Sequence, residues 1–170
     1  MPDNTEKMIN IRNALKNDLQ QILDIYNDAI LNTTSVFQYD VHTIEMREEW
    51  FAQKQKDGFP VFVAEENNVV VGFSTFGSFR AWQGYKYCVE HSIYVRDGQR
   101  NQGIGTFLMQ KIINAARQMN MHTIVAGIDA DNAGSILFHS RFGFEEVAHF
   151  KEVGFKFDKW LDLKFLQLML

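Results

Sequence analysis

Apolar side chains recur along this chain with two different periods. In four segments they return every three or four residues, which places them on one side of a helix. Asn17 or Asp18 can cap the first of these segments, and Asn132 can cap the last, because such side chains accept hydrogen bonds from a first helical turn. The pattern predicts helices over Leu19–Ile30, Thr43–Lys56, Gly103–Asn120 and Asn132–Gly143.

Between these helices lie short runs rich in Val, Ile, Phe and Tyr, which are typical of strands. The resulting order, β-α-α-β-β-β-α-β-α-β-β, predicts an α/β (α+β) fold with a mixed central sheet of about seven strands and helices on both faces. No repeat, low-complexity tract or Pro/Ser-rich linker interrupts the chain, so residues 1–170 are expected to form a single domain. The expected strands are Lys7–Arg12, Val61–Glu65, Val69–Gly77, Lys86–Val95, Thr123–Ile128, Phe144–Val153 and Leu161–Leu170.

Composition and charge narrow the class of protein. The 170 residues are 46% hydrophobic and 14% aromatic, which suits a packed core and argues against disorder. The formal net charge is -4 and Lys and Arg form no block, so neither nucleic acid nor an anionic membrane is expected as a partner. No apolar run reaches membrane-spanning length, residues 1–10 do not resemble a signal peptide, and the one cysteine cannot form an internal disulfide. These features predict a cytoplasmic protein.

The segment 93–108 carries the strongest chemical signal. An apolar strand is followed by a polar turn and then by Gly103 and Gly105 at the start of an amphipathic helix. The free N–H groups of such a first turn lie at the positive end of the helix dipole and bind phosphate or pyrophosphate. A P-loop is excluded because Ile104 and Gly105 replace its Lys and hydroxyl residue, and a dinucleotide fingerprint is excluded because Leu108 replaces its third glycine.

The same segment fits the pattern Arg/Gln-x-x-Gly-x-Gly/Ala, as Arg100-x-x-Gly103-x-Gly105. It resembles the acetyl-CoA pyrophosphate loop of the GNAT superfamily of N-acyltransferases, and the predicted order of strands and helices resembles the GNAT fold. The resemblance implies that acetyl-CoA is the co-substrate. It also implies that its pyrophosphate is held by Arg100, Asn101, Gln102, Gly103, Ile104 and Gly105.

Glu90 is the candidate for a carboxylate that accepts a proton during the reaction. Alternation along its strand places Glu90, Ser92 and Tyr94 on one side and Val89, His91, Ile93 and Val95 on the other. A buried carboxylate is costly unless it is used or paired, and burial raises its pKa toward the range of a general base. The alternative is a solvated edge residue or an ion pair with Arg80.

Three segments narrow the resemblance within the superfamily. Residues 89–95 (Val-Glu-His-Ser-Ile-Tyr-Val), the loop 79–82 and the tail 153–162 together resemble the phosphinothricin and methionine sulfoximine N-acetyltransferases, which acetylate the α-amino group of amino-acid-like substrates. This resemblance implies that Glu90 is the general base and that the chain forms a homodimer. The positions implied to contact the pantetheine arm of acetyl-CoA are the backbone of Ile93, Tyr94 and Val95, and the side chain of Asn132.

Two residues compete for the role of general acid. Many GNAT enzymes place a tyrosine four residues before the glycine that closes the last helix, whereas this chain has His139 there, as the phosphinothricin-type enzymes do. His139 can protonate the departing thiolate, and the Tyr94 hydroxyl is the alternative. The other histidines lack the spacing of metal ligands, so no metal is expected.

Arg80 is the candidate for holding a carboxylate of the acceptor, because a guanidinium pairs with a carboxylate through two hydrogen bonds. Phe37 and Phe79 are expected to line the same pocket. The sequence therefore predicts direct transfer of acetyl from acetyl-CoA to a small amino-acid-like acceptor in a ternary complex. The alternatives are a GNAT enzyme acting on protein N-termini or aminoglycosides, and an acyl-CoA-binding module without turnover.

Overall fold

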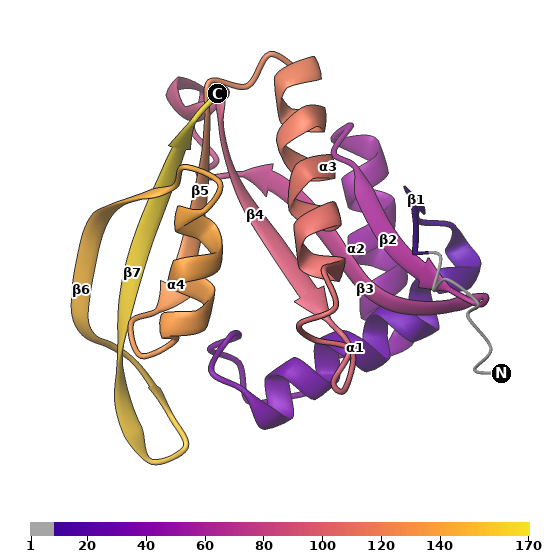
Figure 1. The fold of residues 1–170 in the computed structure, drawn as a ribbon, viewed down its shortest axis with the longest axis horizontal. Coiled ribbons are helices and arrows are strands. Elements are labelled where there is room, and N and C mark those ends of the chain that lie inside the picture. Colours follow the sequence, from indigo (N-terminus) through magenta and orange to yellow (C-terminus); the bar gives the residue numbers. More distant parts are fainter. Residues whose placement is uncertain (1–8) are drawn as a thin grey trace, which may run out of the picture.

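The computed structural model of the protein describes residues 9–170 and contains one seven-stranded sheet (Figure 1). The strands follow the order β1-β2-β3-β4-β5-β7-β6 across the sheet. Four helices cover its two faces, as the sequence predicted. The strands are β1 (Asn10–Asn13), β2 (Val61–Glu66), β3 (Val69–Ser78), β4 (Cys88–Val95), β5 (Thr123–Asp129), β6 (Glu145–Lys156) and β7 (Lys159–Met169). The helices are α1 (Leu19–Asn32), α2 (Ile44–Lys56), α3 (Ile104–Gln118) and α4 (Ala133–Ser140), with short 3-10 turns η1 (Lys16–Asp18) and η2 (Gln83–Tyr85).

The sheet is mixed, because β4 and β5 are parallel while every other neighbouring pair is antiparallel. The helix α3 connects β4 to β5, as a parallel pair requires. The first strand is shorter than the predicted Lys7–Arg12: it runs from Asn10 to Asn13, and Lys7 and Met8 lie outside the described residues.

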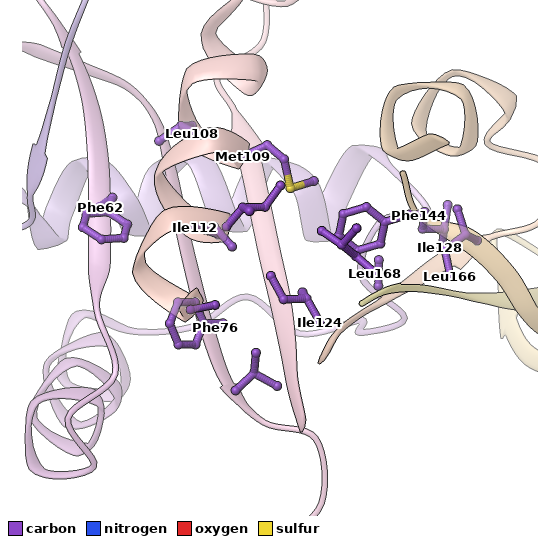
Figure 2. Packing of buried hydrophobic residues seen from close by; sticks show 14 of the residues in the cluster. Phe62, Phe76, Leu108, Met109, Ile112, Ile124, Ile128, Phe144, Leu166 and Leu168 are labelled. Carbon is purple, nitrogen blue, oxygen red and sulfur yellow. The ribbon is translucent and has the colours of Figure 1, made fainter. Parts of the chain in front are cut away.

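The larger core lies between the sheet and α3. Leu108, Met109 and Ile112 of α3 are fully buried and pack against sheet residues that include Phe76 and Ile124 (Figure 2). These three positions share one face of the helix because Leu108 and Met109 lie four and three residues before Ile112. Burial of this apolar stripe fixes the start of α3 relative to the end of β4, where the predicted pyrophosphate loop lies.

The opposite face of the sheet is covered by α1 and α2. Leu19 and Ile22 of α1 pack against Phe73 of β3. The buried side of α2 consists of Phe51 and Arg47, so this helix has little apolar pattern of its own. Strand β4 therefore faces two separate layers, with α3 and α4 on one side and α1 and α2 on the other.

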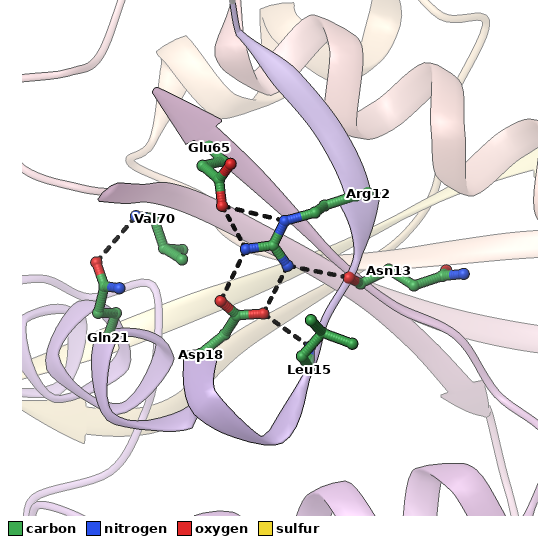
Figure 3. Close-up of polar contacts among 7 residues, drawn as sticks. All are labelled: Arg12, Asn13, Leu15, Asp18, Gln21, Glu65 and Val70. Atoms are coloured by element: carbon green, nitrogen blue, oxygen red, sulfur yellow. Dashed lines mark hydrogen bonds and ion pairs between the residues drawn. The ribbon is translucent and has the colours of Figure 1, made fainter. Parts of the chain in front are cut away.

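A charged corner joins β1, η1 and β2. Arg12 donates to both carboxylate oxygens of Asp18, at 2.7 and 2.9 Å, and also pairs with Glu65 (Figure 3). Asp18 accepts another hydrogen bond from the Leu15 N–H at 2.7 Å. The Arg12 hydrogen bonds lower the pKa of Asp18 below its usual value. Asp18 occupies the cap position of α1, but the prediction that Asn17 or Asp18 caps this helix through its side chain is wrong, since no such bond forms.

The last two strands form a hairpin that the sequence pattern did not predict. Strand β6 continues to Lys156 and β7 begins at Lys159, whereas the expected strands ended at Val153 and began at Leu161. The two connecting residues, Phe157 and Asp158, have φ of 52° and 56°. Two successive residues with positive φ make a tight hairpin turn that usually contains glycine or asparagine, so Phe-Asp carries no recognisable turn signal.

Candidate active site

The parallel pair β4 and β5 is joined for only part of its length. Cys88, Val89 and Glu90 pair with Thr123–Val125, and beyond Glu90 no described strand pairs with this edge of β4. Figure 1 shows the two strands diverging from the top of the view, with the beginnings of α3 and α4 at the open end. The unpaired edge beyond Glu90 leaves backbone groups available to an extended ligand, and the two helix N-termini favour negative charge at its end.

The loop before α3 has the backbone that a diphosphate site needs. Gly103 has φ of 82° and immediately precedes the helix, and Asn101 and Gly98 also have positive φ. The first turn of α3 contains no acidic side chain. Ile104 is buried in the core, so only its backbone N–H can serve a ligand. This geometry fits the pyrophosphate of acetyl-CoA.

Gly105 lies within the first turn of α3 and faces α4. A Cβ atom at this position would lie 3.5 Å from the Phe138 ring, so the glycine allows close packing of the two helices that flank the open end. Asn132 caps α4, accepting a hydrogen bond from the Ser135 N–H at 3.0 Å. The capping role predicted from sequence is confirmed, while contacts of Asn132 and of the Arg100–Gly105 loop with acetyl-CoA stay predictions.

Glu90 stands where β4 leaves β5. Its Oε1 atom approaches Gly127 of β5, where an added Cβ would lie 3.3 Å from that oxygen. Gly127 is exposed although its neighbours Ala126 and Ile128 are buried, so no helix covers this patch of the central sheet. Burial raises the pKa of Glu90, and the positive charge of Arg80 opposes part of that rise. A carboxylate of raised pKa beside an open patch is suited to accept a proton from a bound amine.

Aromatic side chains surround the exposed patch. Phe165 of β7 pairs with Gly127 across the sheet, and its ring centroid lies 6.1 Å from that of Phe79 and 5.8 Å from that of Phe150. Arg80 lies over the Phe79 ring, 4.1 Å from its centroid, and donates to the Phe79 carbonyl oxygen at 2.7 Å. The structure thus brings Phe79 and Arg80 to the Glu90 side of the sheet, with the guanidinium exposed at the surface.

Phe37 lies in the connection between α1 and α2, and its place in the acceptor pocket stays a prediction. Its ring lies against Gly154 of β6, where an added Cβ would be 2.5 Å from a ring carbon. Phe37 is 37% exposed. The connection between α1 and α2 therefore meets the β6–β7 hairpin, although 117 positions separate these two residues in sequence numbering.

His139 lies on the other face of β4 from Glu90. Its Nδ1 is 2.7 Å from the Ser135 carbonyl oxygen, which can only accept, so Nδ1 carries a proton. Its Nε2 is 3.1 Å from Nε2 of His91. The two imidazoles are 5% and 7% exposed, and burial lowers the pKa of both, that of His91 to about 3. Both rings are therefore neutral at pH 7, and both nitrogens of His139 are engaged.

Tyr94, the alternative acid, lies on the same side of β4 as Glu90. Its ring packs against Phe73 and Tyr26, with centroid distances of 5.2 and 5.4 Å. Burial raises the pKa of the Tyr94 hydroxyl strongly, which makes it a weaker proton donor than an ordinary tyrosine.

Sequence reasoning gave no role to Gly127, Phe165 or His91, and it included Lys156 only as part of the tail segment 153–162. An isolated glycine inside an apolar strand, such as Gly127, is a known sign of close approach and was the available clue. The other three act through contacts with distant parts of the chain, for which local sequence has no signal. Two surface hollows lie elsewhere, one beside α2 and one beside the end of α3.

Two findings concern residues 9–170 only. None of the helices in this range combines the length and apolar character needed to cross a membrane. Within the same range, no three His, Cys, Asp or Glu side chains are grouped so that they could hold a metal ion.

Comparison with known proteins identifies the family. Residues 11–164 match the acetyltransferase (GNAT) domain. The L-methionine sulfoximine/L-methionine sulfone acetyltransferase of Salmonella typhimurium is 42% identical over 160 residues, covering 94% of each chain. A ribosomal-protein-alanine N-acetyltransferase from Brucella melitensis is 43% identical, with a TM-score of 0.93 over 95% of this chain and 99% of that one.

A third relative carries the coenzyme. The GNAT superfamily phosphinothricin acetyltransferase from Sinorhizobium meliloti, solved in complex with acetyl-CoA, is 29% identical, with a TM-score of 0.92 over 95% of this chain and 88% of that one. The family match over residues 11–164 and the relative that is 42% identical over nearly the whole chain together establish that this protein belongs to the GNAT family and is an N-acetyltransferase.

Proposed function

We propose that the protein transfers acetyl from acetyl-CoA directly to the α-amino group of a small amino-acid-like acceptor of the methionine sulfoximine, methionine sulfone or phosphinothricin type. The observation that carries this proposal is Glu90, a carboxylate of raised pKa placed where β4 separates from β5 and beside the exposed Gly127. The relatives named above for these acceptors support the same acceptor class.

Glu90 is the proposed general base. An α-amino group has a pKa of about 8 and arrives mostly protonated, so it must lose a proton before it can attack. Glu90 accepts that proton, directly or through a water molecule, on the side of β4 that faces the acceptor. Acetyl-CoA supplies the acetyl group as a thioester, with its arm along the unpaired edge of β4 and its pyrophosphate on the Arg100–Gly105 loop.

The backbone near Ile93 and the side chain of His139 complete the proposed chemistry. A free N–H on the unpaired edge of β4 stabilises negative charge on the carbonyl oxygen during attack. His139 is the proposed acid for the thiolate. Its Nε2 carries no proton in the structure, so to act it must release His91, take up a proton from solvent at Nε2 and then give that proton to the sulfur. Because a thiol of pKa about 8.5 leaves readily, this contribution is small beside that of positioning.

Arg80, Phe79 and Phe37 are the proposed acceptor contacts. The Arg80 guanidinium is exposed on the Glu90 side of the sheet, and its positive charge lowers the pKa of Glu90 in part. A carboxylate bound there would hold the α-amino group near Glu90. Phe37 and Phe79 provide apolar surface for the acceptor side chain.

The testing experiment measures free thiol release from acetyl-CoA with a panel of amines. Methionine sulfoximine, methionine sulfone, phosphinothricin and the common amino acids are compared with a peptide that begins with alanine. Highest kcat/KM with free amino-acid-like acceptors supports the proposal. The same test decides the second candidate, acetylation of a protein N-terminal alanine, which the name of the Brucella melitensis relative favours. Coenzyme binding without release on any amine would indicate a binding module.

We also propose that the chain forms a homodimer in the cytoplasm. Strand β6 ends the sheet, and the hairpin exposes several large apolar side chains: Val147, Phe150, Val153, Phe155, Phe157 and Trp160. Exposed apolar groups of this extent are typical of contact surfaces. Light scattering coupled to size exclusion tests the proposal, since a mass of one chain, 19.8 kDa, would contradict it.

A further inference from the structure

Lys156 is a buried cation at the tip of the β6–β7 hairpin. Its side chain is enclosed, and the residue is only 2% exposed. The ammonium donates to three backbone carbonyl oxygens, those of Ile30 at 2.5 Å, Thr33 at 2.7 Å and Val36 at 2.7 Å. An ammonium has three donors, so every one of them is used. The described residues include no carboxylate paired with this charge.

The charge is stabilised by the end of a helix instead of an acid. Ile30 lies in the last turn of α1, whose final carbonyl groups have no partner within the helix and carry the negative end of its dipole. Thr33 and Val36 continue into the connection that leads to α2. Lys156 therefore holds three carbonyl groups of one segment around a single centre, which fixes the direction in which the chain leaves α1.

Two further contacts join the same segment to the hairpin. The Tyr39 hydroxyl donates to the Phe155 carbonyl oxygen, next to Lys156 in the chain. The Phe37 ring lies against Gly154, where any side chain would collide with it. Residues 33–43 are thus attached to β6 at three successive positions, 154, 155 and 156. Figure 1 shows the hairpin of β6 and β7 extending to the end of α1.

We propose that Lys156 is a positioning residue for the acceptor, because its three hydrogen bonds hold residues 33–43 on the hairpin and so place Phe37 at the acceptor side of the site. This inference rests on the proposed function, which assigns Phe37 to the acceptor pocket. Lys156 itself does not touch the reacting atoms. The contacts of Lys156, Tyr39 and Phe37 described above all join this segment to the hairpin or to the end of α1, and none of them involves α3 or the edge of β4, so we expect Lys156 to affect the acceptor and not the coenzyme.

The first test compares Lys156→Met with Lys151→Met, which changes an exposed lysine of the same strand. Methionine retains the length of the side chain and removes all three donors. We expect Lys156→Met to raise the acceptor KM by about tenfold or more, as loss of charge-assisted hydrogen bonds predicts, with the acetyl-CoA KM nearly unchanged. Lys151→Met should leave both values unchanged. An unchanged acceptor KM in folded Lys156→Met would overturn the proposal, and so would equal rises in both KM values.

The second test does not depend on any acceptor. Hydrogen exchange measured on peptides covering residues 33–43 should become faster in Lys156→Met, while exchange in α3 stays as in the wild type. Unchanged exchange in this segment would show that the Lys156 hydrogen bonds do not hold residues 33–43, and would refute the proposal. Faster exchange combined with no turnover of any amino acid by the wild-type enzyme would instead refute the proposed function, while the role of Lys156 in holding this segment would remain.

A milder variant covers the case in which Lys156→Met does not fold. Tyr39→Phe removes only the hydroxyl that donates to the Phe155 carbonyl. It should raise the acceptor KM and the exchange of residues 33–43 in the same direction, by a smaller factor. Lys156→Gln, which retains two donors but no charge, should lie between the wild type and Lys156→Met. The absence of this graded order would contradict the proposal.

Discussion

The Nε2 atoms of His91 and His139 lie 3.1 Å apart in the layer between the sheet and α4, although 48 positions separate the two residues. Because His139 donates through Nδ1 to the Ser135 carbonyl oxygen, its Nε2 accepts, and His91 must donate through its own Nε2. That arrangement leaves Nδ1 of His91 as a buried acceptor without a partner. Two neutral rings in this order form one chain of hydrogen bonds from β4 to α4.

This chain of hydrogen bonds makes the protein sensitive to acid. The pKa of His91 is about 3 in the folded state because burial disfavours its charged form, whereas the unfolded chain has a pKa near 6.5. The stability contributed by neutral His91 is therefore complete above pH 6.5 and is lost as the pH falls toward 3. The loss approaches about 1.4 kcal/mol per pH unit for one such group.

His91→Gln should reduce this pH dependence, because the glutamine amide can still donate to His139 and does not titrate. Denaturant unfolding at pH 7, 6 and 5 gives the unfolding free energy of both proteins, and hence its slope against pH. Parallel slopes for the wild type and His91→Gln would contradict the assignment.

Glu90→Gln should lower kcat by about 10²–10⁴, the range expected for loss of a general base. Acetyl-CoA binding, measured by calorimetry, should be unchanged because Glu90 lies on the acceptor side of β4. In the wild type, the raised pKa of Glu90 places the acidic limb of the kcat profile above pH 4.5, and activity falls as the pH drops through that limb. A variant with nearly full kcat would exclude Glu90 as the base.

The same substitution should also make the protein more stable at neutral pH. Burial raises the folded-state pKa of Glu90, so ionisation of this carboxyl begins to oppose folding as the pH rises through the lower pKa of the unfolded chain, and the penalty is complete above the folded-state pKa. Glu90→Gln removes the effect, and we expect a higher Tm at pH 7 to 8 and no gain below pH 4, where Glu90 is protonated in both states. In a chain of this size, each kcal/mol of added unfolding free energy raises Tm by about 2–4 °C. A lower Tm for Glu90→Gln at pH 8 would argue against a desolvated carboxylate.

Gly103→Ala should damage the coenzyme site and the loop together. Gly103 has φ of 82°, and an L-residue in this region costs roughly 1–2 kcal/mol. Displacement of the N–H groups at the start of α3 should weaken acetyl-CoA binding by about tenfold, the value of one lost charge-assisted hydrogen bond. Gly84→Ala is the matched control, because Gly84 lacks positive φ and has open space around it. Equal acetyl-CoA affinities in the two variants would remove Gly103 from the site.

Arg80→Ala should raise the KM of acceptors that carry an α-carboxylate by about tenfold to a hundredfold, as expected for hydrogen bonds between charged groups. The acetyl-CoA KM should not change. An otherwise equivalent amine without the carboxylate serves as control and should respond little. If both acceptors respond alike, Arg80 acts on the pocket without binding the carboxylate.

Several features of the site follow from local sequence. Alternation along β4 placed Glu90 on the opposite side from His91, and in the structure His91 meets His139 of α4 while Glu90 approaches the exposed Gly127, because successive strand residues point in opposite directions. Gly103 was recognised from the Arg100-x-x-Gly103-x-Gly105 spacing, and it has a positive φ in the structure, which glycine readily adopts. Asn132 caps α4, as its residue type predicts, and Thr43, the first residue of the second predicted helix, caps α2.

Other features had no local signal. The Phe157-Asp158 turn adopts a conformation that neither residue favours, because pairing of β6 with β7 imposes it. Asp18 has a cap residue type, yet its carboxylate is engaged by Arg12 from another element. In both cases tertiary contacts overrode a local preference.

By itself the sequence determined the elements, their order, the faces of the strands and the glycine turn, because each of these depends on side chains a few positions apart. Only the tertiary structure decided that Glu90 lies beside Gly127, that His91 meets His139 and that Lys156 closes on the end of α1. These contacts depend on strand register and on where β4 separates from β5, and both are set by packing across the whole sheet.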